Sequence, residues 1–354
     1  MRDSLLKNAA AAVVGLVIAV VVIEIFFYAA PNFLPRNVRF VSTSVFDDEL
    51  RQWFKPNIDT LQVLDDGVMW KLKTTDLGLG GIGFRDDGIQ GEPYAVVVGD
   101  SHVYGHGVDA DRSWVEVLEQ RTGRDFVNMG QPAAFPATQE KILERYGARL
   151  GPKLVIFSVF QNDWADAASL AEEAKGGSFT NAKRVLDSYS STYRLARFVA
   201  NIGKYRSQDD SQKFTEGNVS FYVYQFHLGA VVDDRDPTIE YGERSFNESV
   251  MKAADFSRDR GHEIVFVIWP SREQIYIDRL GEFDGSKGAN VNRLNDVMLD
   301  LCASNNLDCV DLTPAFAERR GSLMFYPIDG HPNADGHALA ADVVQNFLKE
   351  RELV

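Results

Sequence analysis

The stretch Tyr94-Ala-Val-Val-Val-Gly-Asp-Ser-His102 decides the fold that this sequence predicts. A short β-branched run between Pro93 and Gly99 is typical of a buried strand. Because the run ends in Gly-Asp-Ser-His, the strand delivers Ser101 at its carboxyl end, where open α/β sheets bind their ligands. A serine in that place is a candidate nucleophile if a base, an orienting carboxylate and oxyanion donors accompany it.

The remainder of the chain alternates short apolar runs with amphipathic segments. This alternation predicts a mostly parallel sheet with helices on both faces. The expected strands are 94–98, 125–128, 153–159, 263–269 and 307–312, and the expected helices are 112–121, 137–149, 245–259, 289–304 and 335–350. The alternation stops between 165 and 244, a stretch too long for a plain loop, so we expect a structured insertion there with a helix over 181–202.

The N-terminal residues form a long apolar run. From 9 to 30 the only charged residue is Glu24, and about 20 apolar residues suffice to span a bilayer. We therefore predict a cytoplasmic N-terminus over 1–8, a transmembrane helix over 9–30 and everything later on the outer side. A cleaved signal peptide is the alternative, although its apolar region usually has only about 7–15 residues.

Glu24 allows two interpretations. An ionisable side chain within a span favours a contact with a partner helix in the membrane. Equally, Glu24 is close enough to the end of the span to reach the lipid headgroups.

The overall composition limits the classes of partner. Of the 354 residues, 45% are hydrophobic and 25% are charged, as in an ordinary globular protein. The net charge of −14 argues against nucleic acid as a partner, because binding its backbone requires a basic face. The two cysteines, Cys302 and Cys309, lie in a predicted helix and the strand after it, near enough to bridge. Both a disulfide, which would favour export, and a pair of buried thiols remain open.

A histidine and a carboxylate lie together before the last predicted helix, in Tyr326-Pro-Ile-Asp-Gly-His331. Ester hydrolysis needs an imidazole that takes the serine proton, here His331, and a carboxylate that holds the imidazole, here Asp329. It also needs donors for the developing oxyanion. Gly130 follows the second strand and lets a backbone N–H approach closely, and Asn162 follows the third strand with a side-chain amide.

These residues resemble a known family. Gly99-Asp-Ser-His102, Gly130, Asn162-Asp163 and Asp329-Gly-His-Pro-Asn-x-x-Gly336 are similar to the four blocks of the SGNH (GDSL-type) hydrolase superfamily. The resemblance covers about 80–354, and Gly83-Phe-Arg85 with the N-terminal apolar run is similar to the membrane-anchored bacterial branch. It implies a three-layer α/β/α flavodoxin-like fold with a central five-stranded, mostly parallel sheet.

The resemblance also implies roles for individual residues. Ser101 would be the nucleophile, His331 the base and Asp329 its partner, and the oxyanion hole would comprise the Ser101 and Gly130 N–H groups and the Asn162 amide. The supporting residues would be Asp100, Asp163 and Asn333, and His102 and His106 could contact substrate. Two positions depart from the family pattern: Ile328 occupies the usual acidic position three residues before His331, and Phe160 replaces a glycine that precedes Asn162.

The predicted domains follow from these assignments. Residues 31–93 are an irregular lead-in that packs on the main domain, and 94–354 form the hydrolase-like domain with its insertion at about 165–244. No metal is predicted, because His102, His106, His331 and His337 would have to converge unusually. No cofactor is predicted either, because the glycines of 78–83 lack the preceding strand and following helix of a dinucleotide site.

The predicted function is that of a single-span, outward-facing serine esterase. It would act on an O-acyl ester, most readily acetyl on an envelope or extracellular glycan, or a small ester, through an acyl-Ser101 intermediate. Attack by a sugar hydroxyl in place of water would make it an acyltransferase with the same residues. The alternative is an accessory subunit of a membrane complex that binds a partner protein through Glu24 or the 165–244 insertion.

Overall fold

The structure is a computed structural model. The described residues are 2–30, 33–34, 44–47, 50–64, 66–89, 91–167, 183, 186, 190–206, 211–216, 219–224, 237–276, 278 and 291–354. The chain divides into two compact units. The first comprises 1–47 with 176–209, and the second comprises 48–175 with 210–354. This division does not test the predicted domain limits, which stay predictions.

The second unit is built on a five-stranded sheet in the order β11-β10-β7-β5-β6, and all four pairings are parallel. Its strands are β5 (Ala95–Val98), β6 (Phe126–Asn128), β7 (Leu154–Val159), β10 (Glu263–Ile268) and β11 (Asp308–Asp311). Every residue of β5 and β7 is buried, as expected for strands covered on both faces. All five strands lie where the alternation of the sequence predicts them.

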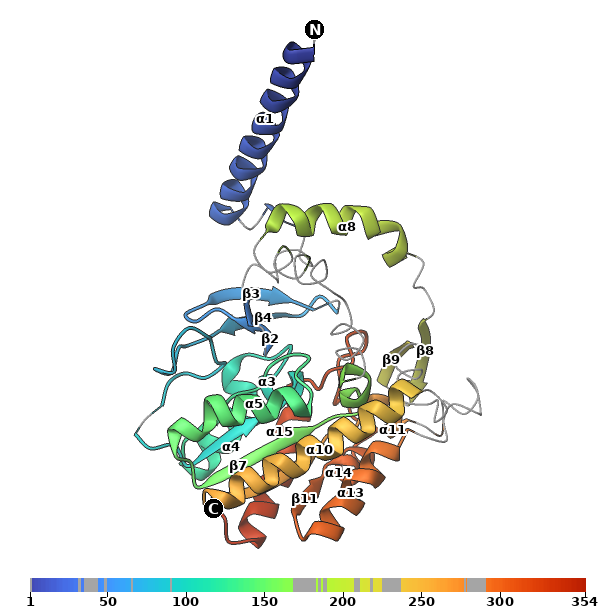
Figure 1. The fold of residues 1–354 in the computed structure, drawn as a ribbon. Coiled ribbons are helices and arrows are strands. Elements are labelled where there is room, and N and C mark those ends of the chain that lie inside the picture. Colours follow the sequence, from blue (N-terminus) through green and yellow to red (C-terminus); the bar gives the residue numbers. More distant parts are fainter. Residues whose placement is uncertain are drawn as a thin grey trace. The chain divides into compact units, whose positions relative to one another are not determined.

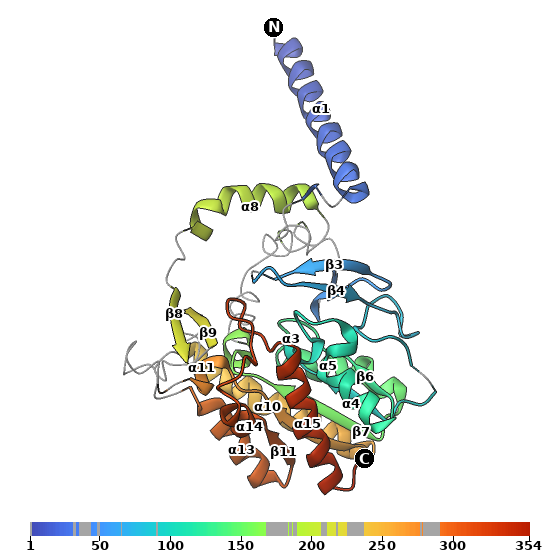
Figure 2. The same cartoon turned by 180° about the vertical axis from the view of Figure 1, so that it is seen from behind.

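Helices cover both faces of this sheet. The helices α5 and α10 pack side by side over one face, towards the viewer in Figure 1, and α4 and α15 pack together over the other, better seen in Figure 2. The helices are α3 (Ser101–Tyr104), α4 (Trp114–Thr122), α5 (Pro136–Arg145), α10 (Pro237–Asp259), α11 (Arg272–Ile275), α13 (Arg293–Asn305), α14 (Thr313–Glu318) and α15 (Ala334–Glu350), with 3-10 turns at Ala110–Arg112 and Gly147–Leu150. The predicted α/β fold class is confirmed.

The lead-in contains regular structure that the sequence analysis missed. Two strands, β3 (Asp59–Val63) and β4 (Met69–Lys73), pair as an antiparallel hairpin. At its tip, Gly67 has a φ of 77°, a conformation that glycine adopts readily. The remaining strands before the sheet are β1 (Ser44–Asp47) and β2 (Arg51–Phe54). The Asp66-Gly67 pair between alternating runs is a recognised hairpin signal, so this element was predictable.

The predicted insertion also has described elements. The helix α8 (Ser191–Arg206) overlaps the second half of the expected helix over 181–202. Most of the first half of that expected helix lies outside the described residues. The strands β8 (Ser211–Glu216) and β9 (Val219–Tyr224) form a second hairpin. The next helix, α10, begins at Pro237 instead of the expected 245, so its first turns lie inside the predicted insertion.

The first unit contains the apolar N-terminal helix α1 (Arg2–Ala29). Its segment Lys7–Ala29, 23 residues, is long and apolar enough to cross a membrane, a test that a signal sequence also passes. The carboxylate of Glu24 accepts hydrogen bonds from the Ser190 hydroxyl and from the Ser191 and Thr192 backbone N–H groups. The structure thus gives Glu24 a partner within its own chain.

The two cysteines are joined in the second unit. A disulfide connects Cys302 in α13 to Cys309 in β11, with the two Cα atoms 6.3 Å apart. It ties the end of a surface helix to the edge strand that follows it.

Candidate active site

Ser101 lies where β5 passes into the short helix α3. The Asp100 side chain accepts a hydrogen bond from the His102 N–H at 2.9 Å, which caps this helix at its first turn. Gly99 makes the turn possible, because a Cβ there would lie 2.2 Å from the Val103 side chain. The local sequence therefore turns the chain sharply and exposes Ser101 at the carboxyl edge of the sheet.

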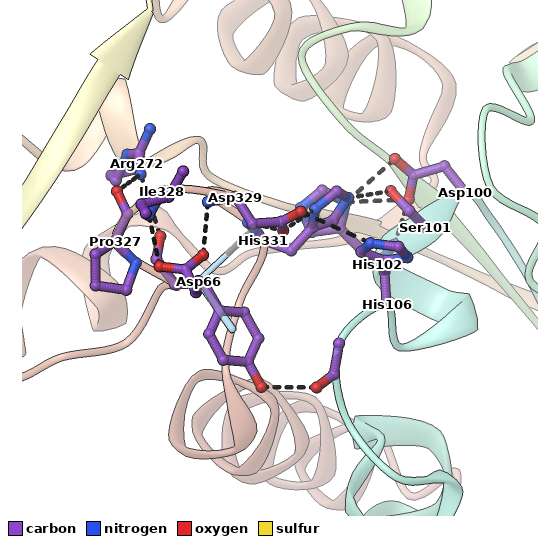
Figure 3. Close-up of polar contacts among 12 residues, drawn as sticks. Asp66, Asp100, Ser101, His102, His106, Arg272, Pro327, Ile328, Asp329 and His331 are labelled. Carbon is purple, nitrogen blue, oxygen red and sulfur yellow. Dashed lines mark hydrogen bonds and ion pairs between the residues drawn. The ribbon is translucent and has the colours of Figure 1, made fainter. Parts of the chain in front are cut away.

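Three side chains from two distant parts of the chain form a hydrogen-bonded row (Figure 3). His331 Nε2 lies 2.8 Å from Ser101 Oγ, and His331 Nδ1 lies 2.6 Å from Asp329 Oδ1. The His331 backbone N–H also donates to Asp329 Oδ1, at 3.2 Å. The structure therefore brings together the nucleophile, base and orienting carboxylate that the sequence predicts, with the carboxylate two residues before the histidine.

The Asp329 carboxylate faces a second histidine. His106 Nε2 lies 3.7 Å from Asp329 Oδ2. Burial alone would raise the pKa of Asp329, but the hydrogen bonds and charges of His106 and His331 hold it well below its usual range. Burial, together with the His331 charge, lowers the pKa of His106. Asp329 therefore remains ionised when His331 takes up a proton.

The loop that carries Asp329 and His331 is held by Asp66 at the tip of the β3–β4 hairpin. Its Oδ1 accepts from the Ile328 N–H and its Oδ2 from the Asp329 N–H, each at 2.8 Å. Asp66 is not among the predicted site residues, because the lead-in is expected to be irregular.

Arg272 and β9 hold the same loop from its other side. Arg272 Nη1 donates to the carbonyls of Tyr326 and Pro327 at 3.2 and 2.9 Å, and the Tyr222 N–H donates to the Pro327 carbonyl at 2.8 Å. The guanidinium is 1% exposed and also pairs with Glu273. Sequence reasoning missed Arg272 too, although its place just after a strand, as for Ser101 and Asn162, was a usable signal.

A second Asp–His pair lies behind the nucleophile. Both Asp100 oxygens lie 3.1 Å from His102 Nδ1. Burial would raise the pKa of Asp100, yet the neighbouring His102 lowers it. Asp163, which accepts from the Phe160 N–H at 3.0 Å, has its pKa raised well above the usual range by burial and by the Asp100 charge. These residues brace the strand ends beneath Ser101.

The predicted oxyanion role of Gly130 stays a prediction, because its N–H has a partner within the protein in this geometry. That N–H donates to Asn128 Oδ1 at 3.0 Å. A Cβ on Gly130 would lie 2.2 Å from the Tyr104 backbone nitrogen, so the residue is glycine because α3 packs directly against it. Asn162 does border the site, and its amide donates to Asp166 Oδ2 at 2.9 Å.

A cavity of about 320 Å³ opens beside the three side chains. Its described walls comprise Ser101, His102, Phe160, Gln161, Asn162, Ala165, Asp166, Ser271, Arg272, Glu273, Asp329, Gly330 and His331. Of the two histidines predicted to contact substrate, His102 is thus in the wall, whereas His106 is not among these residues. Phe160 packs on His102 with ring centroids 4.1 Å apart, so it fills space that a glycine would leave open.

Two further features of this region are a helix cap and a group of side chains with metal-binding donor atoms. Asn333 caps α15 by accepting from the Asp335 and Gly336 N–H groups, which fixes the helix that follows the loop. His106, Asp329 and His331 offer donor atoms that all lie within 4.8 Å of one another, as a metal site would. Since both ring nitrogens of His331 already have partners in Ser101 and Asp329, this cluster is better suited to proton transfer.

Part of the chain is similar to a known protein family. Residues 238–354 match the family model ALGX, described as an SGNH hydrolase-like domain, acetyltransferase AlgX. No curated protein sequence matches the chain.

Several solved structures are similar at low identity. One is a G-D-S-L family protein described as lipolytic, from Desulfitobacterium hafniense DCB-2, with 12% identity, a TM-score of 0.43 and coverage of 72% of this chain and 99% of that one. Another is a catalytic mutant of the acetylxylan esterase Axe2 from Geobacillus stearothermophilus, with 13% identity, a TM-score of 0.40 and coverage of 73% and 95%.

The family match confirms the predicted resemblance over residues 238–354, which contain the last of the four sequence blocks, and the apolar helix α1 supports the membrane-anchored branch in part. Residues 238–354 therefore match an SGNH hydrolase-like domain.

Proposed function

We propose that this protein is a membrane-anchored serine esterase or acyltransferase that forms an acyl-Ser101 intermediate. The observation that carries the proposal is the unbroken row from Ser101 Oγ through His331 to Asp329, with contacts of 2.8 and 2.6 Å. This row borders a cavity large enough for a small acyl group and part of its alcohol.

The reaction follows from the geometry. As Ser101 Oγ attacks the ester carbonyl, its proton passes to His331 Nε2, and ionised Asp329 stabilises the imidazolium. The tetrahedral intermediate then expels the alcohol, which takes the proton from His331 and leaves the acyl group on Ser101. Water or a second hydroxyl attacks the acyl group, with His331 again as base, and restores the serine.

We place three donors at the oxyanion, namely the Ser101 N–H, the Gly130 N–H after it exchanges its Asn128 partner, and the Asn162 amide. The Ser101 N–H is at the first residue of α3, and the Asn162 amide reaches the carbonyl oxygen when it exchanges its Asp166 partner for substrate. Removing one such donor typically lowers kcat by about 10²–10³-fold.

We assign an acetyl group on an extracellular or envelope glycan as the substrate. The acetyltransferase description of the matched family supports the acetyl group and keeps transfer as well as hydrolysis within the proposal. A single span over α1 with the hydrolase-like domain outside the cytoplasmic membrane, in the periplasm or beyond, agrees with the disulfide between Cys302 and Cys309.

The test uses the full-length protein in detergent with p-nitrophenyl acetate and a fluorophosphonate probe. We expect hydrolysis and covalent labelling, and Ser101→Ala should abolish both, whereas Ser322→Ala, a change at an exposed serine, should retain them. Absence of labelling in well-folded protein would overturn the enzymatic proposal and favour an accessory subunit. Adding an oligosaccharide separates the two reactions, because a transferase yields an acetylated sugar detectable by mass spectrometry.

A further inference from the structure

The first turn of α8 is bound to the N-terminal apolar helix. The Glu24 carboxylate accepts from the Ser191 N–H and, at 2.9 Å, from the Thr192 N–H. The Ser190 hydroxyl donates to the same carboxylate and accepts from the Tyr193 N–H at 3.0 Å. The N–H groups that a helix start leaves without intrahelical partners are thus satisfied, and the negative charge of Glu24 lies at the positive end of the helix dipole.

This contact fixes the depth at which α8 begins. Glu24 lies about 7.5 Å before the end of α1 at Ala29, given a rise of 1.5 Å per residue. In a helix that crosses a bilayer, that position is at the boundary between the hydrocarbon core and the headgroups. The first residues of α8 are bound to Glu24, and α8 runs crosswise to α1 (Figures 1 and 2). The helix α8 therefore extends along that boundary and does not cross it.

The residues of α8 suit an anionic interface. Besides the buried Arg194, which donates to the Ser191 hydroxyl, the helix contains Arg197, Lys204 and Arg206 and no acidic residue, within a chain whose net charge is −14. Val199 is 59% exposed and lies beside the exposed Ala196 and Ala200, so that an apolar strip is open next to exposed Arg197. A basic helix with an exposed apolar strip is the pattern of segments that lie in a membrane surface.

We infer that α8 is an interfacial helix that docks on anionic phospholipid headgroups and is held at that depth by Glu24. This inference rests on the membrane anchor of the proposed function but not on its esterase activity. The charge complementarity and the continuity with α1 single out the lipid surface as the occupant.

The test places one environment-sensitive fluorophore on the full-length protein in nanodiscs that contain brominated lipids. The label is attached to Val199→Cys in α8, to Leu16→Cys in α1 as the anchor control and to Leu299→Cys in α13 as the control outside the membrane. The native cysteines are protected by their disulfide. We expect at least twofold quenching at position 199, strongest with bromines near the headgroups, and none at position 299.

The outcomes separate the inference from the anchor. Quenching at position 16 without quenching at position 199 overturns the role of α8 and leaves the anchor in place. Absence of quenching at position 16 overturns both, while the p-nitrophenyl acetate assay still reports on the enzyme.

Two further pairs of variants test the positive charge of α8 and its contact with Glu24. Arg197→Gln should weaken the response at position 199 to added phosphatidylglycerol, whereas Arg260→Gln, an exposed change in the other unit, should not. Glu24→Leu, which removes every acceptor, should lower quenching at position 199 more than Glu24→Gln, which keeps one oxygen. Equal quenching in both Glu24 variants and the parent would overturn the tethering by Glu24.

Discussion

At the scale of single residues, the site depends on carboxylates that hold other groups in place. Asp329 orients His331, Asp66 holds the backbone next to Asp329, and Asp100 caps the helix that carries Ser101. The sequence predicts the first and third of these, because each lies beside the group it serves. Asp66 was beyond local reasoning, since a contact between residues so distant in the chain leaves no mark on their neighbours in sequence.

Replacing Asp329 by Asn should lower kcat for p-nitrophenyl acetate by about 10³–10⁴-fold with little change in KM. The amide has no charge to stabilise the imidazolium and can favour the wrong tautomer of His331. Asp335→Asn, which changes an exposed carboxylate at the start of α15, should retain the parental rate. A near-parental rate for Asp329→Asn would mean that another group orients His331.

Replacing Asp66 by Asn should lower kcat by about 10–100-fold, because small displacements of a base cost rates of that size. The carboxylate accepts from two backbone N–H groups, and an amide would turn its own NH₂ towards one of them. Asp59→Asn alters an exposed carboxylate of the same hairpin and is the matched control. Rates should be measured well below the unfolding temperature, and equal kcat in both variants would refute a positioning role.

At the scale of elements, the periodicity of the sequence predicts the five central strands because each is a short buried run between turn residues. The hairpins β3–β4 and β8–β9 were missed for different reasons. The first hairpin has a clear Asp66-Gly67 turn that was overlooked. The second hairpin is made of polar and aromatic residues without a simple alternation. Gly130 shows a further limit: the sequence indicates a close approach there, but not that the approaching group is α3.

Replacing Gly130 by Ala should destabilise the protein by at least about 1–3 kcal/mol, because the new methyl group would overlap the backbone of α3. Gly321→Ala adds a methyl group in open space and should change the free energy of unfolding by less than about 0.5 kcal/mol. Urea unfolding monitored by tryptophan fluorescence measures both variants. Parental stability in Gly130→Ala would contradict the close packing of α3 against this residue.

At the scale of the whole molecule, acidic groups set the pH dependence of stability. Burial raises the pKa of Asp86 to about 7, and burial together with nearby Glu119, Asp87 and Asp86 raises that of Glu116 to about 7. In the unfolded chain such groups titrate near pH 4. Between these values the folded state binds more protons than the unfolded state, so its stability falls as pH rises.

The unfolding temperature should therefore decrease from about pH 5 to about pH 8. Glu116→Gln should make this decrease shallower, because it removes one group that retains its proton only in the folded state. Glu318→Gln, a change at an exposed glutamate of α14, should follow the parent. A slope that is the same in all three proteins would show that Glu116 does not contribute.

The clamp between Asp66 and the Ile328–Asp329 backbone can form only late in the synthesis of the chain. Its partners are 262 residues apart, and Ser101 is 230 residues from His331. At ordinary rates of synthesis, the histidine emerges on the order of 10–50 s after the serine. In the proposed mechanism Ser101 has no base during that interval, so the timing of translation itself keeps the serine inert until His331 has been made.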